Sequence, residues 1–263
     1  MCSGFLARTD ELAARQRRGS VNPVFVPLYD VNPLRSIRFQ YANLALILTN
    51  IVVFVLFQAQ DVIAGNDCGQ ALLAKVFGII PMELLGTQVS FEGCPQTLIG
   101  ALAVPEPLTL ISYAFLHGDI LHLLGNMLFL WVFGDNVEDA LGHVRYVIFY
   151  ILCGIAAGLL HIGLNLDSTA PLIGASGAIS GVVAAYLLLH PRVHLWVLVL
   201  RVIPLQVPAY WALGAWILMN VVLAVIPLEP LVAWWAHVGG MIAGAILVIF
   251  MRRPGVPLLA GPS

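Results

Sequence analysis

Charged residues are scarce in this sequence. Asp, Glu, Lys and Arg make up only 10% of its 263 residues, whereas 60% are hydrophobic, and the mean hydropathy is +0.93. An ordinary globular domain of this length would not stay soluble with that composition. The sequence therefore predicts a protein of the lipid bilayer. Its small net charge of −2 gives no support for nucleic-acid binding.

Acidic residues are missing from the centres of the apolar runs. Glu229 is the one carboxylate within them, and it falls in a connection. Ion-coupled transporters usually rely on buried Asp or Glu side chains, and so do aspartyl intramembrane proteases. The sequence therefore argues against both classes. The segments considered are 41–60, 120–134, 146–166, 176–190 and 208–250.

Metal-binding and redox motifs are also absent. No His-Glu-x-x-His occurs, which argues against a zinc intramembrane protease. No Cys-x-x-Cys or Cys/His metal spacing is found either, so we expect neither a metal nor a cofactor. Cys68 and Cys94 fall in one predicted outer loop, and the sequence leaves open whether they form a disulfide. No internal repeat of the kind found in transporters is visible.

Long apolar runs are what the sequence does contain. Crossing a hydrocarbon core about 30 Å thick takes roughly 20 helical residues, and helices are the default because a backbone in lipid must satisfy its own polar groups. The predicted fold is an all-α membrane protein, a six-transmembrane-helix bundle with a long outer loop, 61–115, between the first two spans. The spans are 41–60, 116–134, 146–166, 176–190, which is shorter than the rest, 208–227 and 231–250.

The basic residues predict the orientation. Short loops rich in Lys and Arg stay on the cytoplasmic side. With six spans and a cytoplasmic N-terminus, all eleven arginines lie inside and only Lys75 lies outside. We therefore expect a multi-pass protein, placed in a bacterial inner membrane, with both termini cytoplasmic. The predicted divisions are a tail (1–40), a six-span domain (41–250) and a second tail (251–263).

Few polar side chains are predicted to lie at membrane depth, which makes each one a functional candidate. His122 and Asn126 are four residues apart, so on a helix they share one face and offer N–H groups to an oxyanion. The alternative is that they bond between helices for packing alone. The full set is His122, Asn126, His161, Ser176, Ser180, Asn220 and His237.

Ser176 and His237 each lie beside small residues. Ser176 stands in Gly174-Ala175-Ser176-Gly177, which on its own is more typical of close helix packing than of catalysis. His237 shares a helix face with Gly240 and Gly244. If that face meets the helix of Ser176, the backbones approach and the hydroxyl reaches the ring. Because the run 176–190 is short, Ser176 should lie below the outer surface, at the bottom of a cavity that opens outward.

In combination these motifs resemble the rhomboid intramembrane serine proteases. The resemblance covers roughly 41–250 and rests on Gly174-Ala175-Ser176-Gly177, on His122-x-x-x-Asn126, and on Ala236-His237-x-x-Gly240-x-x-x-Gly244. It implies that Ser176 is the nucleophile and His237 the general base, a dyad without a carboxylate. It further implies an oxyanion hole made by the backbone N–H of Ser176 with the side chains of His122 and Asn126.

The resemblance also implies smaller roles and shows departures. Glu138 matches an acidic position that anchors a cytoplasmic loop, and His117 matches a histidine near the cavity mouth. The Trp-Arg pair often found in the first loop has no counterpart here. Ser180 stands where some members carry a tyrosine that stacks on the catalytic ring.

The implied substrate is a transmembrane segment of another membrane protein, which enters between the second and fifth spans. The predicted partners are that substrate and the lipid bilayer, with no nucleic acid. The sequence does not give the oligomeric state. A catalytically silent rhomboid-like protein that binds clients remains the main alternative, and a small-molecule transporter or channel is the other.

Overall fold

The computed structural model of the chain describes residues 25–84, 86–87, 89, 104–199, 202–226 and 232–260. Several of the predictions above concern residues outside these ranges, so their structure is not described. They are the tail 1–24 with its arginines, part of the outer loop, Cys94, Arg201 and Glu229. Cys68 is disulfide-bonded.

Among the described residues, four helices are long and apolar enough, by length and composition, to cross a membrane. Two of them contain a turn of π-helix: α2 (Tyr41–Val53) continues through η1 (Phe54–Gln58) into α3 (Ala59–Ala64), and α8 (Ile120–Phe129) continues through η4 (Leu130–Gly134) into α9 (Asp135–Leu141). The other two are α10 (His143–Leu164) and α13 (Trp234–Met251). Shorter apolar helices are α11 (Ser176–Leu189) and α12 (Ala209–Val225).

A three-stranded antiparallel sheet corrects the all-α expectation. Its order is β1-β2-β3, with β1 (Phe25–Asp30) paired to β2 (His194–Val199) and β2 paired to β3 (Ile203–Pro208). The segments of β2 and β3 are rich in Val, Leu and Ile and only six residues long, which suits a hairpin and is too short for a span. Because β1 comes from a distant part of the chain, the local sequence pattern does not reveal it.

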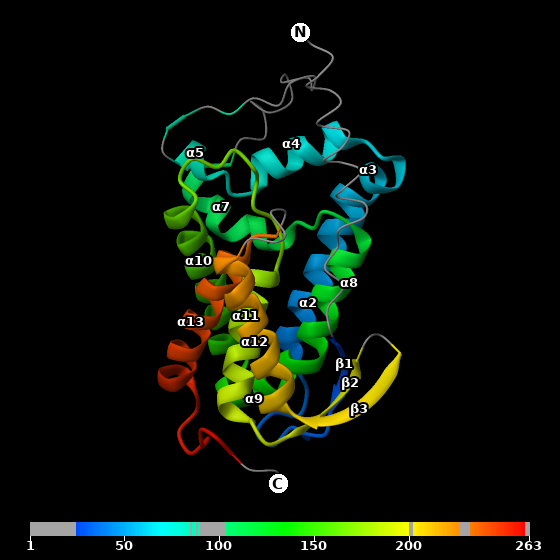
Figure 1. The fold of residues 1–263 in the computed structure, drawn as a ribbon, viewed down its shortest axis with the longest axis vertical. Helices are drawn as coiled ribbons and strands as arrows, with labels where there is room; N and C mark the ends of the chain where they lie inside the picture. The colour runs from blue at the N-terminus through cyan, green and yellow to red at the C-terminus, as the bar shows by residue number, and fades with distance from the viewer. Residues whose placement is uncertain are drawn as a thin grey trace.

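The two ends of the bundle carry different elements (Figure 1). The sheet lies at the end where α13 finishes and the described C-terminal segment begins. The opposite end carries the short helices of the first long connection. These are α4 (Asp67–Phe77), α5 (Pro81–Leu84), α7 (Glu106–Ser112) and the 3₁₀ turn η3 (Tyr113–Phe115).

Glycine brings α11 and α13 together, as the spacing of Gly240 and Gly244 predicts. A Cβ atom added to Gly240 would collide with the carbonyl oxygen of Gly177, and one added to Gly244 would collide with that of Gly181. A Cβ at Gly181 would lie 2.9 Å from the carbonyl oxygen of Gly240. The two backbones are therefore in direct contact, which no larger residue at these positions would allow.

The second long helix runs to Leu141, seven residues beyond its predicted end, and its last turns are acidic. The carboxylate of Glu138 accepts hydrogen bonds from the backbone N–H groups of Ala42 at 3.0 Å and Asn43 at 2.7 Å, and so caps the start of α2. It also contacts Nδ1 of His143. Glu138 thus ties the first span to the second. The resemblance implies instead that this position anchors a cytoplasmic loop, and that role stays a prediction.

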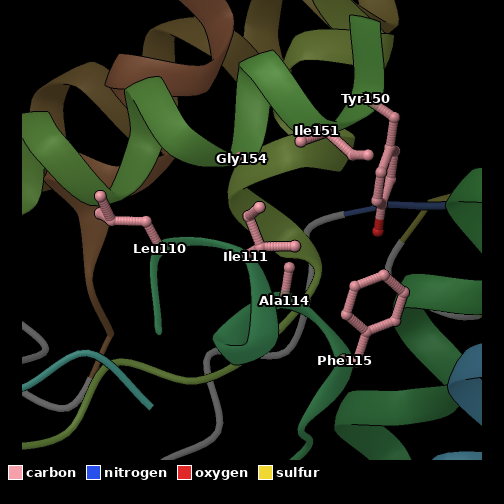
Figure 2. Close-up of a pocket in the computed structure, with 7 residues that line it drawn as sticks. All are labelled: Leu110, Ile111, Ala114, Phe115, Tyr150, Ile151 and Gly154. Carbon is pink, nitrogen blue, oxygen red and sulfur yellow. The ribbon is translucent and has the colours of Figure 1, made fainter. Parts of the chain in front are cut away.

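A small apolar pocket lies between the α7–η3 segment and α10 (Figure 2). Its one side-chain polar atom is the hydroxyl of Tyr150, which Figure 2 shows across the pocket from Leu110. The pocket does not include Ser176 or His237, so it is separate from the candidate active site. Its lining residues are Leu110, Ile111, Ala114, Phe115, Tyr150, Ile151 and Gly154.

Candidate active site

Ser176 is the first residue of α11, and the turn that precedes it is fixed by Gly174. Gly174 has a φ of +121°, a conformation that L side chains rarely adopt, and its N–H donates to the carbonyl of Tyr113 at 2.9 Å. A Cβ at Gly174 would lie 2.7 Å from Cε1 of His122 and 3.8 Å from Oγ of Ser176. This glycine therefore places the hydroxyl and the His122 ring on the same side of the turn.

Ser176 and His237 lie within hydrogen-bonding distance across the glycine-lined interface. Oγ of Ser176 is 2.9 Å from Nε2 of His237. Both side chains are partly exposed rather than sealed in the core. A hydroxyl paired with an imidazole nitrogen in this way is the arrangement in which a serine can lose its proton as it attacks. The structure thus joins two residues that are 61 positions apart in the chain.

Asn220 holds the other ring nitrogen of His237. Its Oδ1 lies 2.7 Å from Nδ1 of His237, and its Nδ2 donates to the carbonyl of Trp216 at 2.7 Å. Sequence reasoning noted Asn220 as a polar side chain at membrane depth but gave it no role. The contact joins two different helices, so no local spacing in the sequence could have revealed it.

His122 and Asn126 lie on α8, beside the turn that carries Ser176. Asp119 caps this helix, because its carboxylate accepts a hydrogen bond from the backbone N–H of His122 at 2.8 Å. The His122 ring packs against Gly174, as described above. Asn126 lies one turn further along, is buried, and has an Nδ2 atom without a partner among the described residues. A buried donor of this kind is available to a substrate oxygen.

Two indole rings surround the imidazole of His237. The Trp234 ring meets it edge-on at 5.6 Å, and the Trp216 ring is nearly parallel to it at 6.5 Å. Ser180 stands where some rhomboids carry a tyrosine, and its Oγ donates instead to the backbone carbonyl of Ser176 at 2.7 Å. The support of the ring thus comes from α12 and α13, not from position 180.

His117 lies between η3 and α8, with its ring 5.2 Å from that of His122. Gln58 clamps its backbone, since its Nε2 donates to the His117 carbonyl at 2.8 Å and its Oε1 accepts from the His117 N–H at 3.0 Å. Both ring nitrogens of His117 are buried and have no partner among the described residues.

Comparison with known proteins places this chain in a family. The Rhomboid domain family matches residues 105–254. The chain is 30% identical over 201 residues to "RHOMBOID-like protein 5" of Arabidopsis thaliana. The aligned region covers 72% of this chain and 62% of that protein. It is 30% identical over 152 residues to "Rhomboid protein 1, mitochondrial" of Saccharomyces cerevisiae. That aligned region covers 54% of this chain and 41% of the yeast protein.

The chain therefore spans less than two thirds of the length of these relatives. Because they are plant and yeast proteins, the bacterial inner membrane stays a prediction. The matched segment contains α8 and every later helix described above, and with them Ser176, His237, His122 and Asn126. On this match and on its apolar helices, the chain is an integral membrane protein that belongs to the rhomboid family.

Proposed function

We propose that this protein is an intramembrane serine endopeptidase that cleaves transmembrane segments of other membrane proteins. The observation that carries the proposal is the 2.9 Å approach of Ser176 Oγ to His237 Nε2. A serine that served only helix packing would not require an imidazole nitrogen within hydrogen-bonding distance. In a rhomboid chain that keeps both residues, the pair favours catalysis over silent client binding.

In this mechanism Ser176 Oγ attacks the carbonyl carbon of the scissile peptide bond while Nε2 of His237 takes its proton. The tetrahedral intermediate collapses, the C–N bond breaks, and His237 returns the proton to the leaving amine. This leaves an acyl-enzyme on Ser176. A water molecule then attacks the ester with His237 again as base, which releases the new carboxyl end and restores the serine.

The developing oxyanion needs donors that are already in place. The first N–H groups of a helix have no partner within it, so the backbone N–H of Ser176 at the start of α11 is one donor. The Nδ2 atom of Asn126 and the ring of His122 are the others. Their support is the Nδ2 atom of Asn126, which has no partner in the described part of the chain, and the packing of His122 against Gly174.

The proposal includes six spans with both termini in the cytoplasm. In the described part of the chain, the arginines gather at the end of the bundle that carries the sheet, whereas Lys75 lies on α4 at the opposite end (Figure 1). That asymmetry supports a cytoplasmic sheet and an outward-facing start of α11. The arginines concerned are Arg35, Arg38, Arg145, Arg192, Arg252 and Arg253.

The proposed path of the substrate lies between α8 and α12, where Phe129 meets Trp216 with ring centroids 5.6 Å apart. Two apolar rings can separate at this point without breaking a hydrogen bond. An intact substrate helix hides its carbonyl groups in its own hydrogen-bond ladder, so it must unwind locally before Ser176 can attack. We expect helix-weakening residues near the cleaved bond.

The test is cleavage of a single-span substrate by the purified protein in proteoliposomes. The wild type and the Ser168→Ala variant should cleave, because Ser168 lies in the connection between α10 and α11. Ser176→Ala should abolish cleavage while the protein stays folded. Retained cleavage by Ser176→Ala would remove the assignment, and a wild type that binds the substrate without cleaving it would favour the silent client-binding alternative.

A further inference from the structure

Asn220 is a fully buried polar residue in the apolar helix α12. Its side chain makes two hydrogen bonds, one to its own helix and one to His237 of α13. A buried amide is costly unless it is satisfied, and a packing role would be met by an apolar residue of similar size. The hydrogen bond between Asn220 and His237 therefore indicates a role for Asn220 at the candidate active site.

The first bond fixes which way the amide points. The partner of Nδ2 is the backbone carbonyl of Trp216, which can only accept a hydrogen bond. The NH₂ group must therefore face Trp216, and the oxygen must face Nδ1 of His237 at 2.7 Å. The reversed amide would place two acceptors against each other.

The orientation of the amide in turn fixes the histidine. Because Oδ1 of Asn220 can only accept, the ring must carry a proton on Nδ1. A neutral imidazole has a single N–H, so Nε2 is then bare and accepts from the Ser176 hydroxyl at 2.9 Å. The chain of bonds runs from the Trp216 carbonyl to Asn220, to His237 and on to Ser176, and every donor in it meets an acceptor.

We propose that Asn220 is a positioning residue for the reaction, which holds His237 in the tautomer and ring orientation that leave Nε2 free to take the serine proton. The inference rests on the proposed function. It replaces the predicted two-residue dyad with a Ser-His-Asn arrangement contributed by α11, α13 and α12. A neutral amide orients the ring without adding a charge inside the membrane, where a carboxylate would be costly.

Two substitutions of similar shape separate this role from packing. Asn220→Leu keeps the branching at Cγ and removes the acceptor, whereas Asn220→Asp keeps an acceptor facing Nδ1. We expect Asn220→Leu to lower kcat about 10- to 100-fold with little change in KM, because the ring then samples the wrong tautomer. Asn220→Asp should retain more activity than Asn220→Leu.

Asn50 of α2 provides a matched control. It is also fully buried, and its Nδ2 donates to the carbonyl of Leu46, four residues earlier, at 2.8 Å. Asn50→Leu should leave kcat unchanged. If Asn220→Leu is folded and turns over at the wild-type rate, or if Asn50→Leu loses as much activity, the proposed role of Asn220 is wrong.

The tautomer of His237 can be measured by NMR without any cleavage assay. This measurement therefore tests the inference separately from the proposed function. With ¹⁵N-labelled histidine in micelles, the wild-type His237 ring should show a protonated Nδ1 and a bare Nε2. Asn220→Leu should show a mixture or the reverse. A wild-type ring protonated on Nε2 overturns the inference, whereas a protein that cleaves nothing but has the expected tautomer contradicts the protease assignment and leaves the control of the His237 tautomer by Asn220 in place.

Discussion

At the residue scale, the site depends on backbone positions as much as on reactive side chains. Gly174 adopts a left-handed φ and lies against the His122 ring, so one missing Cβ lets the serine turn and α8 approach. The sequence shows Gly174 two residues before Ser176. It does not show that this glycine makes room for His122, because His122 comes from another helix.

Gly174→Ala should therefore lower activity by moving His122 away from the serine turn. The added Cβ would lie 2.7 Å from Cε1 and 2.8 Å from Nε2 of His122, and the φ of +121° is strained for alanine. We expect kcat to fall by at least about 10-fold, less than the roughly 100- to 1000-fold loss found on complete removal of an oxyanion donor, because His122 is displaced and not removed. The measurement is substrate cleavage in proteoliposomes, with Gly125→Ala as control because a Cβ there meets nothing within 4 Å.

Asp30 of β1 makes the stability of the protein depend on pH. Its Oδ2 accepts hydrogen bonds from Tyr186 at 2.6 Å and from Asn136 at 3.0 Å, and burial raises its pKa from 3.8 to about 6. The folded protein thus binds this proton more tightly than the unfolded chain does. The stability contributed by Asp30 falls as pH rises from about 4 to 6.

Asp30→Asn should remove that dependence. The variant should melt close to the wild type at pH 4 and above it at pH 7.5, since asparagine keeps an acceptor without the buried charge. Thermal unfolding in detergent at the two pH values measures the difference. An equal shift in Tm at both values would show that the charge of Asp30 is not the cause.

At the element scale, the apolar runs predict the helices well and their polar ends poorly. The run 176–190 corresponds to α11, Ser176–Leu189. The apolar pattern predicts an end at residue 134 for the second helix, which is too early, because Asp135, Glu138 and Asp139 interrupt that pattern. Asp139, for example, accepts from three backbone N–H groups of the segment before α2. A segment with several carboxylates is typical of a loop in a membrane-protein sequence. Only the hydrogen bonds to distant residues explain why this acidic segment is helical.

The glycine contact between α11 and α13 should be the least tolerant interface of the described bundle. In Gly240→Ala the Cβ would collide with the Gly177 carbonyl, a backbone atom that cannot turn aside. We expect a loss of about 3 kcal/mol of stability, at the upper end for overpacking. Gly214→Ala on α12 is the control, since a Cβ there meets nothing within 4 Å. Equal melting temperatures for the two variants would contradict the close contact.

At the scale of the whole molecule, the composition and the long apolar runs predict a membrane bundle. The pairing of Ser176 with His237 is predicted from their motifs in combination and from the family resemblance. The sequence does not predict the sheet, because β1 pairs with β2 more than 160 positions away. It does not predict the bond from Asn220 to His237 either. Both are contacts between distant segments, and no local periodicity encodes them.

The proposed orientation is tested by cysteine labelling in intact cells. Gln60 on α3 and Arg38 before α2 are both exposed and lie beyond opposite ends of α2. In a Cys2→Ser background, Gln60→Cys should react with a membrane-impermeant maleimide, and Arg38→Cys should react only after permeabilisation. The reverse pattern would invert the topology.

The most direct test of the central claim is labelling with a serine-directed fluorophosphonate, with the modified residue located by mass spectrometry. The account predicts a covalent adduct on Ser176 in the wild type, and its loss in both Ser176→Ala and His237→Ala. Labelling that persists in Ser176→Ala, or a folded wild type that never reacts, would contradict a serine nucleophile at this site.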